Sequence, residues 1–119
     1  MSKKILIAED DGFLQKMVTV SLEEAGFEVI KADDGKQAIQ ALEHEKPDLL
    51  LLDIMMPKLD GFGVLEHMKQ KKSTVPVIII SNLGQEEDVD KCKKLGAKDY
   101  CIKSDMEPGD LVEQVKKYV

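Results

Sequence analysis

Acidic residues follow two apolar runs of the sequence, at positions where they could do chemistry. Glu9 and Asp10 follow the run ILIA, and Asp53 follows four consecutive leucines. A carboxylate among apolar neighbours is costly to bury unless a cation or a hydrogen-bond donor pairs with it. Oxygen ligands without histidine or thiolate favour Mg²⁺, which proteins hold with one or two carboxylates, waters and a phosphate. The pattern therefore predicts a magnesium site in which Asp53, desolvated by its leucines, attacks phosphorus as a nucleophile.

Two further side chains suit phosphoryl chemistry. Ser81 follows the apolar run VIII, and Lys103 follows the run DYCI. A metal ion and a lysine ammonium group can neutralise the oxygens of a phosphoryl group in transfer, and a hydroxyl can donate a hydrogen bond to one of them. We expect both residues to lie beside the acids.

Strand-like and helix-like segments alternate along the chain, and they must bring these residues together. Apolar runs predict strands at residues 4–8, 27–32, 48–53, 75–81 and 98–103. Helical spacing of apolar residues and capping residues predict helices at about residues 14–25, 33–45, 61–71 and 85–95, and from Pro108 onward. The first, third and fourth strands are apolar almost throughout, which is typical of a parallel sheet covered on both faces.

The alternation predicts one α/β domain over residues 1–119. Its fold is a doubly wound, five-stranded parallel sheet with helices on both faces, in the flavodoxin-like strand order 2-1-3-4-5. Ligands bind such sheets at the carboxyl ends of the strands. Glu9 and Asp10, Asp53, Ser81 and Lys103 all stand at predicted strand ends, so the sequence predicts that they converge on one rim.

Other residues with possible roles have simpler interpretations. Asp11 precedes one predicted helix, and Asp33 and Asp34 stand at the start of the next, where acids commonly form a turn and a cap. Four methionines are expected to fill the hydrophobic core: Met17, Met55, Met56 and Met68. We therefore predict structural roles for these side chains, although the backbone carbonyl of Met55 is considered again below.

The composition narrows the function classes. The net charge is −6, and all 17 basic residues are lysines. Without arginine, the commonest specific contact to guanine is missing, so direct binding of nucleic acid is not expected. The apolar runs are too short to cross a membrane. Two cysteines without ligand-type spacing indicate reduced thiols in a cytoplasmic protein.

The sequence resembles the receiver domains of bacterial two-component response regulators. The resemblance covers essentially all of the chain, and several short motifs in consistent order make it specific. The residues that carry it are Glu9, Asp10, Asp53, Met56, Pro57, Asp60, Gly61, Ser81, Gly96, Ala97, Tyr100 and Lys103.

The resemblance implies a phosphoryl-accepting function. Asp53 would take a phosphoryl group from the phosphohistidine of a sensor histidine kinase or a phosphotransfer protein. Asp10, Asp53 and the backbone carbonyl of Met55 would bind Mg²⁺ directly, and Glu9 would act through a bound water. Such a domain is not an enzyme in the usual sense, because it catalyses only its own phosphorylation and slow dephosphorylation.

The resemblance also implies a switch. Lys103 would pair with Asp53 before transfer and with the phosphoryl group afterwards. Ser81 would donate its hydroxyl to a phosphoryl oxygen, and Tyr100 would turn from exposed to buried. The face formed by the helix at residues 85–95, the strand at 98–103 and the last helix would report this change to a downstream effector. Homodimerisation through this face on phosphorylation is a further expectation.

There are two alternatives to a phosphorylated receiver, and a departure from the family at Ser104 bears on the first of them. Proline usually follows the lysine of the fifth strand, often after a cis peptide bond, but here the residue is Ser104, which favours a trans bond. This departure keeps open a binding module of the same fold that is never phosphorylated. A phosphatase of the haloacid-dehalogenase type is disfavoured, because it needs a second acid two residues after the nucleophile, where this chain has Met55.

Overall fold

The computed structural model describes residues 2–119, in which five strands alternate with five α-helices. The strands are β1 (Lys4–Ala8), β2 (Glu28–Ala32), β3 (Leu49–Asp53), β4 (Val77–Ser81) and β5 (Asp99–Ile102). The helices are α1 (Gly12–Glu24), α2 (Gly35–Glu45), α3 (Gly61–Gln70), α4 (Glu86–Lys94) and α5 (Pro108–Lys116), with a 3₁₀ helix at Lys103–Asp105. Over these residues no helix combines the length and the apolar character that a membrane crossing requires.

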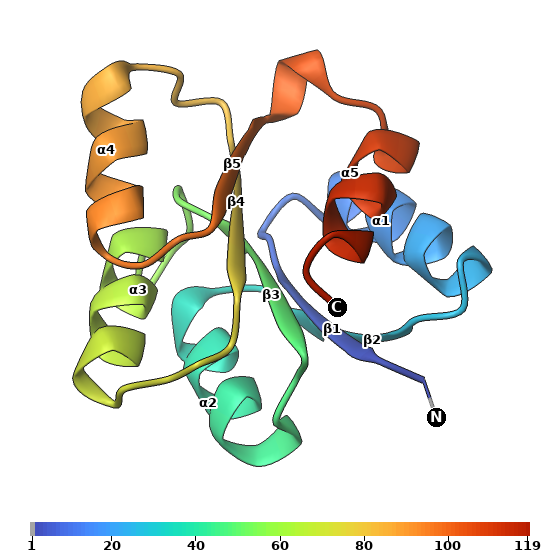
Figure 1. The fold of residues 1–119 in the computed structure, drawn as a ribbon, viewed down its shortest axis with the longest axis horizontal. Helices are drawn as coiled ribbons and strands as arrows, with labels where there is room; N and C mark the ends of the chain where they lie inside the picture. Colours follow the sequence, from blue (N-terminus) through green and yellow to red (C-terminus); the bar gives the residue numbers. More distant parts are fainter. Residues whose placement is uncertain (1) are drawn as a thin grey trace.

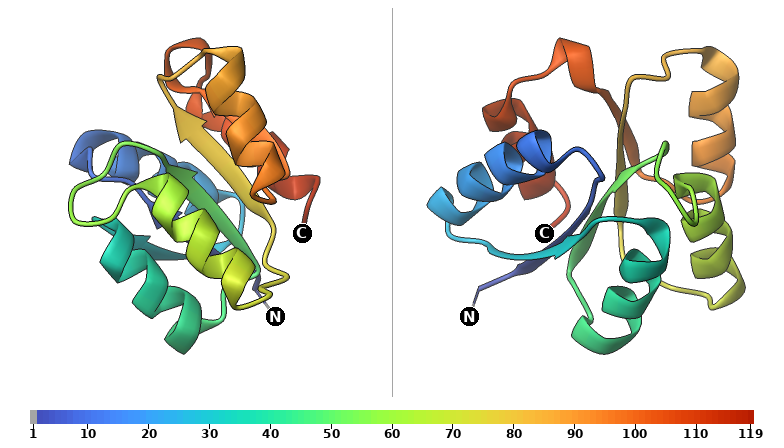
Figure 2. Two further views of the ribbon diagram at one scale, coloured as in Figure 1. Left: turned by 90° about the vertical axis from the view of Figure 1, so that its left-hand side faces the viewer. Right: turned by 180° about the vertical axis from the view of Figure 1, so that it is seen from behind.

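The strands form one parallel sheet between two layers of helices. The strand order is β2-β1-β3-β4-β5, and each neighbouring pair is parallel. Helices α1 and α5 cover one face, and α2, α3 and α4 cover the other (Figures 1 and 2). The predicted doubly wound fold and its strand order are confirmed.

The four leucines of β3 are explained by this two-sided cover. Leu49 and Leu51 pack with residues of α1 and α5, such as Val18 and Leu111. Leu50 and Leu52 belong to the second core cluster, on the side of α2, α3 and α4. Successive side chains of a strand point to opposite faces. A central strand with helices on both faces therefore needs an unbroken apolar run rather than an alternating one.

Acidic side chains cap the first three helices. The carboxylate of Asp11 accepts hydrogen bonds from the backbone nitrogens at the start of α1, and those of Asp34 and Asp60 do the same for α2 and α3. The predicted caps at Asp11 and Asp34 are confirmed. Asp33 does not cap α2, because its side chain is engaged by an amide from α1 instead.

The expectation that four methionines fill the core is confirmed for Met56 and Met68 but is wrong for Met17 and Met55. Met17 is 39% exposed to solvent and Met55 is 65% exposed. Met17 lies on the outer side of α1, whose buried positions are occupied by Val18 and Leu22. Met55 lies in the loop after β3 between Ile54 and Met56, which are both buried in the core, so Met55 is the residue of this stretch that faces solvent.

Candidate functional site

Three carboxylates meet at the carboxyl ends of β1 and β3. Glu9 and Asp10 follow β1, Asp53 is the last residue of β3, and these two strands are neighbours. One carboxylate oxygen of each residue lies within 4.8 Å of those of the other two. Glu9 is fully buried and Asp53 is 2% exposed, whereas Asp10 is exposed to solvent. The acids predicted at the strand ends therefore do converge, and their cluster opens to solvent at Asp10.

Lys103 contacts both buried acids. Its Nζ atom lies 2.6 Å from Glu9 Oε1 and 3.2 Å from Asp53 Oδ2. The lysine begins the 3₁₀ helix rather than ending β5, which corrects the predicted strand by one residue because pairing with β4 stops at Ile102. All peptide bonds of the described residues are trans, including the one before Ser104. The lysine thus reaches the acids without the proline that usually follows it.

Burial dominates the electrostatics of the two inner acids. Desolvation raises the pKa of Glu9 to about 7, although Lys103 and the backbone nitrogen of Asp11 oppose the shift. Desolvation also raises the pKa of Asp53, against hydrogen bonding with Glu9 and the attraction of Lys103. Burial lowers the pKa of Lys103, but its ion pairs with both acids outweigh this effect and raise it overall. When all three clustered acids are ionised, they carry more negative charge than the single ammonium group of Lys103 balances.

The donor set fits a hard divalent cation. All three clustered side chains offer carboxylate oxygens, and the described part of the site includes no thiolate or imidazole. Such a set suits Mg²⁺, which keeps several waters and takes few protein ligands. A cation at this position would also relieve the excess charge of the buried acids. The residues present therefore fit the predicted metal, with Glu9, Asp10 and Asp53 around it.

The free energy of unfolding of the metal-free protein should fall as the pH rises from about 4.5 to about 7, because Glu9 titrates at a higher pH in the folded state than in the unfolded state. Glu9 has a pKa of about 7 when folded and 4.5 as its ordinary value, so the folded state binds more protons between these two pH values. The free energy of unfolding in chelator should therefore fall by on the order of 2 kcal/mol across this window. Mg²⁺ at about ten times its Kd should restore roughly 1.4 kcal/mol, or about 5 °C in Tm, at the upper end.

The measurement is a series of thermal melts in chelator and in Mg²⁺ at matched ionic strength. Glu9→Gln is the control, because it removes the shifted carboxyl while keeping the shape of the side chain. The variant should lose most of the decrease in stability with pH. An identical pH dependence in wild type and variant would contradict the assignment to Glu9.

The loop after β3 folds closely against the backbone of Asp53. A Cβ atom at Gly61 would lie 2.5 Å from the Asp53 carbonyl oxygen and 2.7 Å from Ile54 Cα, so only glycine fits there. Gly61 N donates to the Ile54 carbonyl at 2.8 Å, which closes the loop. Met55 N also donates to Asp53 Oδ1 at 3.3 Å and so orients the carboxylate. The carbonyl of Met55 as a metal ligand stays a prediction.

Ser81 and Tyr100 both hold Leu83, in the loop between β4 and α4. The buried Ser81 hydroxyl accepts a hydrogen bond from Leu83 N at 3.0 Å. The Tyr100 hydroxyl donates to the Leu83 carbonyl, and burial raises the pKa of this half-buried tyrosine. The loop beside the acids is thereby tied to β5. The roles of Ser81 toward a phosphoryl group and of Tyr100 in switching stay predictions.

Two residues of this region were not predicted from the sequence. Leu83 makes its contacts through its backbone nitrogen and carbonyl, which any residue type other than proline would offer, so the sequence carries no signal for it. Gln15 is buried on α1, and its amide donates to backbone carbonyls at the ends of β1 and β2. A signal for Gln15 does exist: it stands three and seven residues before the buried Val18 and Leu22, on the inner face of the helix.

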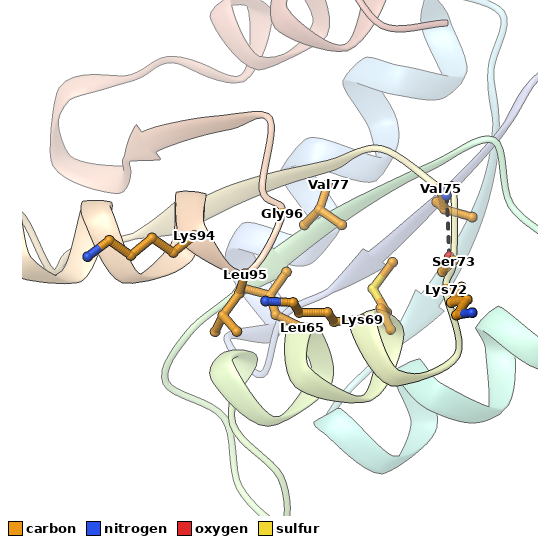
Figure 3. Close-up of a pocket in the computed structure, with 10 residues that line it drawn as sticks. Leu65, Lys69, Lys72, Ser73, Val75, Val77, Lys94, Leu95 and Gly96 are labelled. Carbon is orange, nitrogen blue, oxygen red and sulfur yellow. Dashed lines mark hydrogen bonds between the residues drawn. The ribbon is translucent and has the colours of Figure 1, made fainter.

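The residues that line the groove in Figure 3 lie away from the acids. The groove has a volume of about 290 Å³ and lies between α3, the start of β4 and the end of α4. Lys69 and Lys94 stand in the last turns of α3 and α4, where cations complement the carbonyl ends of helices. In Figure 3 the amino group of Lys94 points away from that of Lys69. The favourable interaction with the helix ends accounts for the positions of Lys69 and Lys94. None of the predicted site residues lines the groove.

Comparison with known proteins assigns the family. The model of the response regulator receiver domain matches residues 5–116. The alkaline phosphatase synthesis transcriptional regulatory protein PhoP of Bacillus subtilis (strain 168) is 38% identical over 116 residues, which cover 98% of this chain and 48% of that protein. The phosphate regulon transcriptional regulatory protein PhoB of Escherichia coli (strain K12) is 36% identical over 118 residues, 98% of this chain and 51% of that protein.

A solved structure agrees with these relatives. The Francisella response regulator 1452 receiver domain has a TM-score of 0.93 and 31% identity, with 98% of this chain and 96% of that one covered. The chain spans about half the length of the two regulators PhoP and PhoB. The fold, the acids at its strand ends and these similarities lead to one conclusion: the chain belongs to the response regulator receiver domains of two-component systems.

Proposed function

We propose that Asp53 accepts a phosphoryl group from the phosphohistidine of a sensor histidine kinase or a phosphotransfer protein, with Mg²⁺. The observation that carries this proposal is the buried Asp53 carboxylate, 3.2 Å from Lys103 and clustered with Glu9 and Asp10. An Asp53 oxygen attacks the phosphorus and forms a P–O bond. The P–N bond to the histidine breaks, and its electron pair stays on the imidazole nitrogen.

Each neighbour of Asp53 has a role in this transfer. When bound, Mg²⁺ neutralises oxygens of the phosphoryl group and of Asp53. Lys103, which balances the buried acids before transfer, moves its charge toward the phosphoryl oxygens afterwards. Ser81, whose oxygen now accepts from Leu83 N, donates its hydroxyl hydrogen to one of these oxygens, and its shift toward the phosphoryl group strains the contact with Leu83 N. The chain would catalyse only this transfer and the slow hydrolysis of its own acyl phosphate.

The output surface of the proposal is the face formed by α4, β5 and α5. Leu83 precedes α4 and is held by Ser81 and by Tyr100 of β5, so a new bond at Ser81 must disturb both elements. Phosphorylation would then shift the populations of two states of this face through differential contacts. The face would bind an effector, or a second copy of the chain. Because this acidic chain has no arginine, a separate domain or protein would contact DNA where the output is transcription.

Acetyl phosphate with Mg²⁺ tests the function without a partner. The receiver proposal predicts a mass increase of one phosphoryl group, which chelator prevents and which hydroxylamine removes. A haloacid-dehalogenase-type phosphatase would instead turn over acetyl phosphate continuously. A binding module of the same fold would show neither adduct nor turnover. Continuous turnover, or no adduct in excess Mg²⁺, would contradict the proposal.

An apolar patch beside the acids suits the phosphoryl donor. Phe13, Met17 and Val20 of α1 are 75%, 39% and 45% exposed, and with Pro108 they line a hollow of about 380 Å³. Helix α1 starts two residues after Asp10, so this patch adjoins the open side of the site. Exposed apolar patches of this kind mark interaction surfaces. A helix of the donor protein that brings its phosphohistidine to Asp53 would cover the patch.

Phe13→Ser should separate partner binding from chemistry. Transfer from a kinase or phosphotransfer protein that phosphorylates the wild type should fall about tenfold or more, because the variant loses the most exposed apolar contact. Phosphorylation by acetyl phosphate should not change. Val119→Ser is the control, because Val119 is also exposed but lies outside the patch. Equal losses with both phosphoryl donors would contradict a docking role.

A further inference from the structure

A buried glutamine amide lies behind the loop that carries Glu9 and Asp10. Gln15 is 8% exposed and sits in the first half of α1, among apolar core residues. A buried amide is stable only if its donors are satisfied. The hydrogen bonds of its amide nitrogen lead to the ends of β1 and β2 and to Asp33 just after β2, so its placement depends on the end of the sheet where the acids lie.

Three oxygen atoms surround the Gln15 amide nitrogen. Nε2 lies 2.9 Å from the Glu9 carbonyl, 3.1 Å from the Ala32 carbonyl and 3.1 Å from Asp33 Oδ1, and its two hydrogens serve these three acceptors, two of which share one hydrogen. The Ala32 carbonyl also accepts from Glu9 N at 3.1 Å. One side chain therefore joins the end of β1, the end of β2 and the turn before α2.

This contact constrains the backbone of the acidic pair. The Glu9 carbonyl lies in the same planar peptide unit as the Asp10 nitrogen. A hydrogen bond that fixes this carbonyl therefore fixes the direction in which the chain enters Asp10. The cluster oxygens of Glu9, Asp10 and Asp53 lie within 4.8 Å, an arrangement that a rotated peptide would disperse.

We propose that Gln15 is a positioning residue for the metal site: it holds the Glu9–Asp10 peptide so that both carboxylates face Asp53. The amide nitrogen of Gln15 reaches the acidic pair through the Glu9 backbone carbonyl and not through a carboxylate of the cluster. The inference rests on the proposed function, because the bound metal is what the positioning serves. Outer partners that orient the ligands of a metal commonly change its affinity by tenfold or more when removed.

Two variants test the proposal by Mg²⁺ titration, followed through backbone amide chemical shifts. Gln15→Met keeps the approximate volume but has no donor, and Gln15→Glu keeps the shape but replaces the amide by a carboxyl. Both should raise the Kd for Mg²⁺ about tenfold. Phosphorylation by acetyl phosphate should recover at saturating Mg²⁺, because the reacting groups remain.

Val18→Ala is the matched control for stability. Val18 lies three residues further along the same buried face and makes only core contacts. Its variant should be destabilised with a Kd within about twofold of the wild type. If the glutamine variants also keep the wild-type Kd, or if Val18→Ala raises it as much as they do, Gln15 is not a positioning residue.

A wild-type measurement keeps the test valid if the variants do not fold. The two Gln15 side-chain amide protons should exchange slowly with solvent in chelator and should shift when Mg²⁺ is added. Rapid exchange would overturn the proposal. Failure of the wild type to bind Mg²⁺ would contradict the proposed function instead, and slow exchange in chelator would still report the Gln15 hydrogen bonds.

Discussion

Asp53→Asn is expected to abolish phosphorylation by acetyl phosphate and by any histidine kinase or phosphotransfer protein that phosphorylates the wild type. Of the three clustered acids, only Asp53 is the last residue of a strand, the central strand β3; like Glu9, it is buried and pairs with Lys103. An amide at this position has no nucleophilic carboxylate. The fold should be retained, and in chelator the Tm should equal or exceed that of the wild type, because a carboxyl whose pKa is raised by burial is removed.

The control for this variant is Asp90→Asn. Asp90 is an exposed acid on α4, so its replacement changes the net charge equally without touching the site. It should be phosphorylated at the wild-type rate. Incorporation of phosphate into a folded Asp53→Asn protein at the wild-type level would show that another residue is the acceptor.

Lys103→Met should have the second-largest effect, because it leaves two buried acids without their counter-ion. The free energy of unfolding near pH 7 should fall by about 2 to 3 kcal/mol in chelator, and by less in Mg²⁺. The pKa values of Glu9 and Asp53 should rise further, because the ammonium group that lowers both is lost. Mg²⁺ binding should persist, because Lys103 donates no ligand to a cation.

The Lys103→Met variant should also lose the conformational change that phosphorylation is proposed to cause in the loop after β4. Beryllofluoride with Mg²⁺ should shift the amide resonances of Ser81, Leu83 and Tyr100 in the wild type but shift them far less in Lys103→Met. Lys98→Met is the control, since Lys98 is exposed and precedes β5 at its opposite end. Normal shifts in Lys103→Met would mean that the lysine only balances charge and does not couple phosphorylation to the loop.

The fold could be predicted because its strongest determinants are local in the sequence. Strand β1 lies at its predicted residues, and the other strands differ from theirs by one or two residues at their ends. The apolar runs of β3 and β4 can be buried only in a strand covered on both sides. Met17 was misplaced because helical spacing alone does not decide which of two apolar stripes faces the sheet. Tertiary packing turned the stripe with Phe13 and Met17 outward.

The part of the site that could be predicted is the set of residues that stand at the carboxyl ends of strands. Parallel strands bring their carboxyl ends to one edge, so the meeting of Glu9, Asp10, Asp53 and Lys103 follows from topology. The pairing of Lys103 with Glu9, at 2.6 Å, depends on how the chain turns after β5, which the sequence does not specify. The backbone links of Gln15 and Leu83 likewise depend on loop geometry, because any residue type offers the same carbonyl.

The central claim is that Asp53 is the phosphoryl acceptor, and locating the adduct tests it most directly. The wild-type chain is treated with acetyl phosphate and Mg²⁺, reduced with borohydride to convert the acyl phosphate to an alcohol, and mapped by peptide mass spectrometry. We expect the reduced residue at Asp53 alone, and none when chelator replaces Mg²⁺. Reduction at Asp10, Glu9 or any other acid, with Asp53 intact, would contradict the assignment.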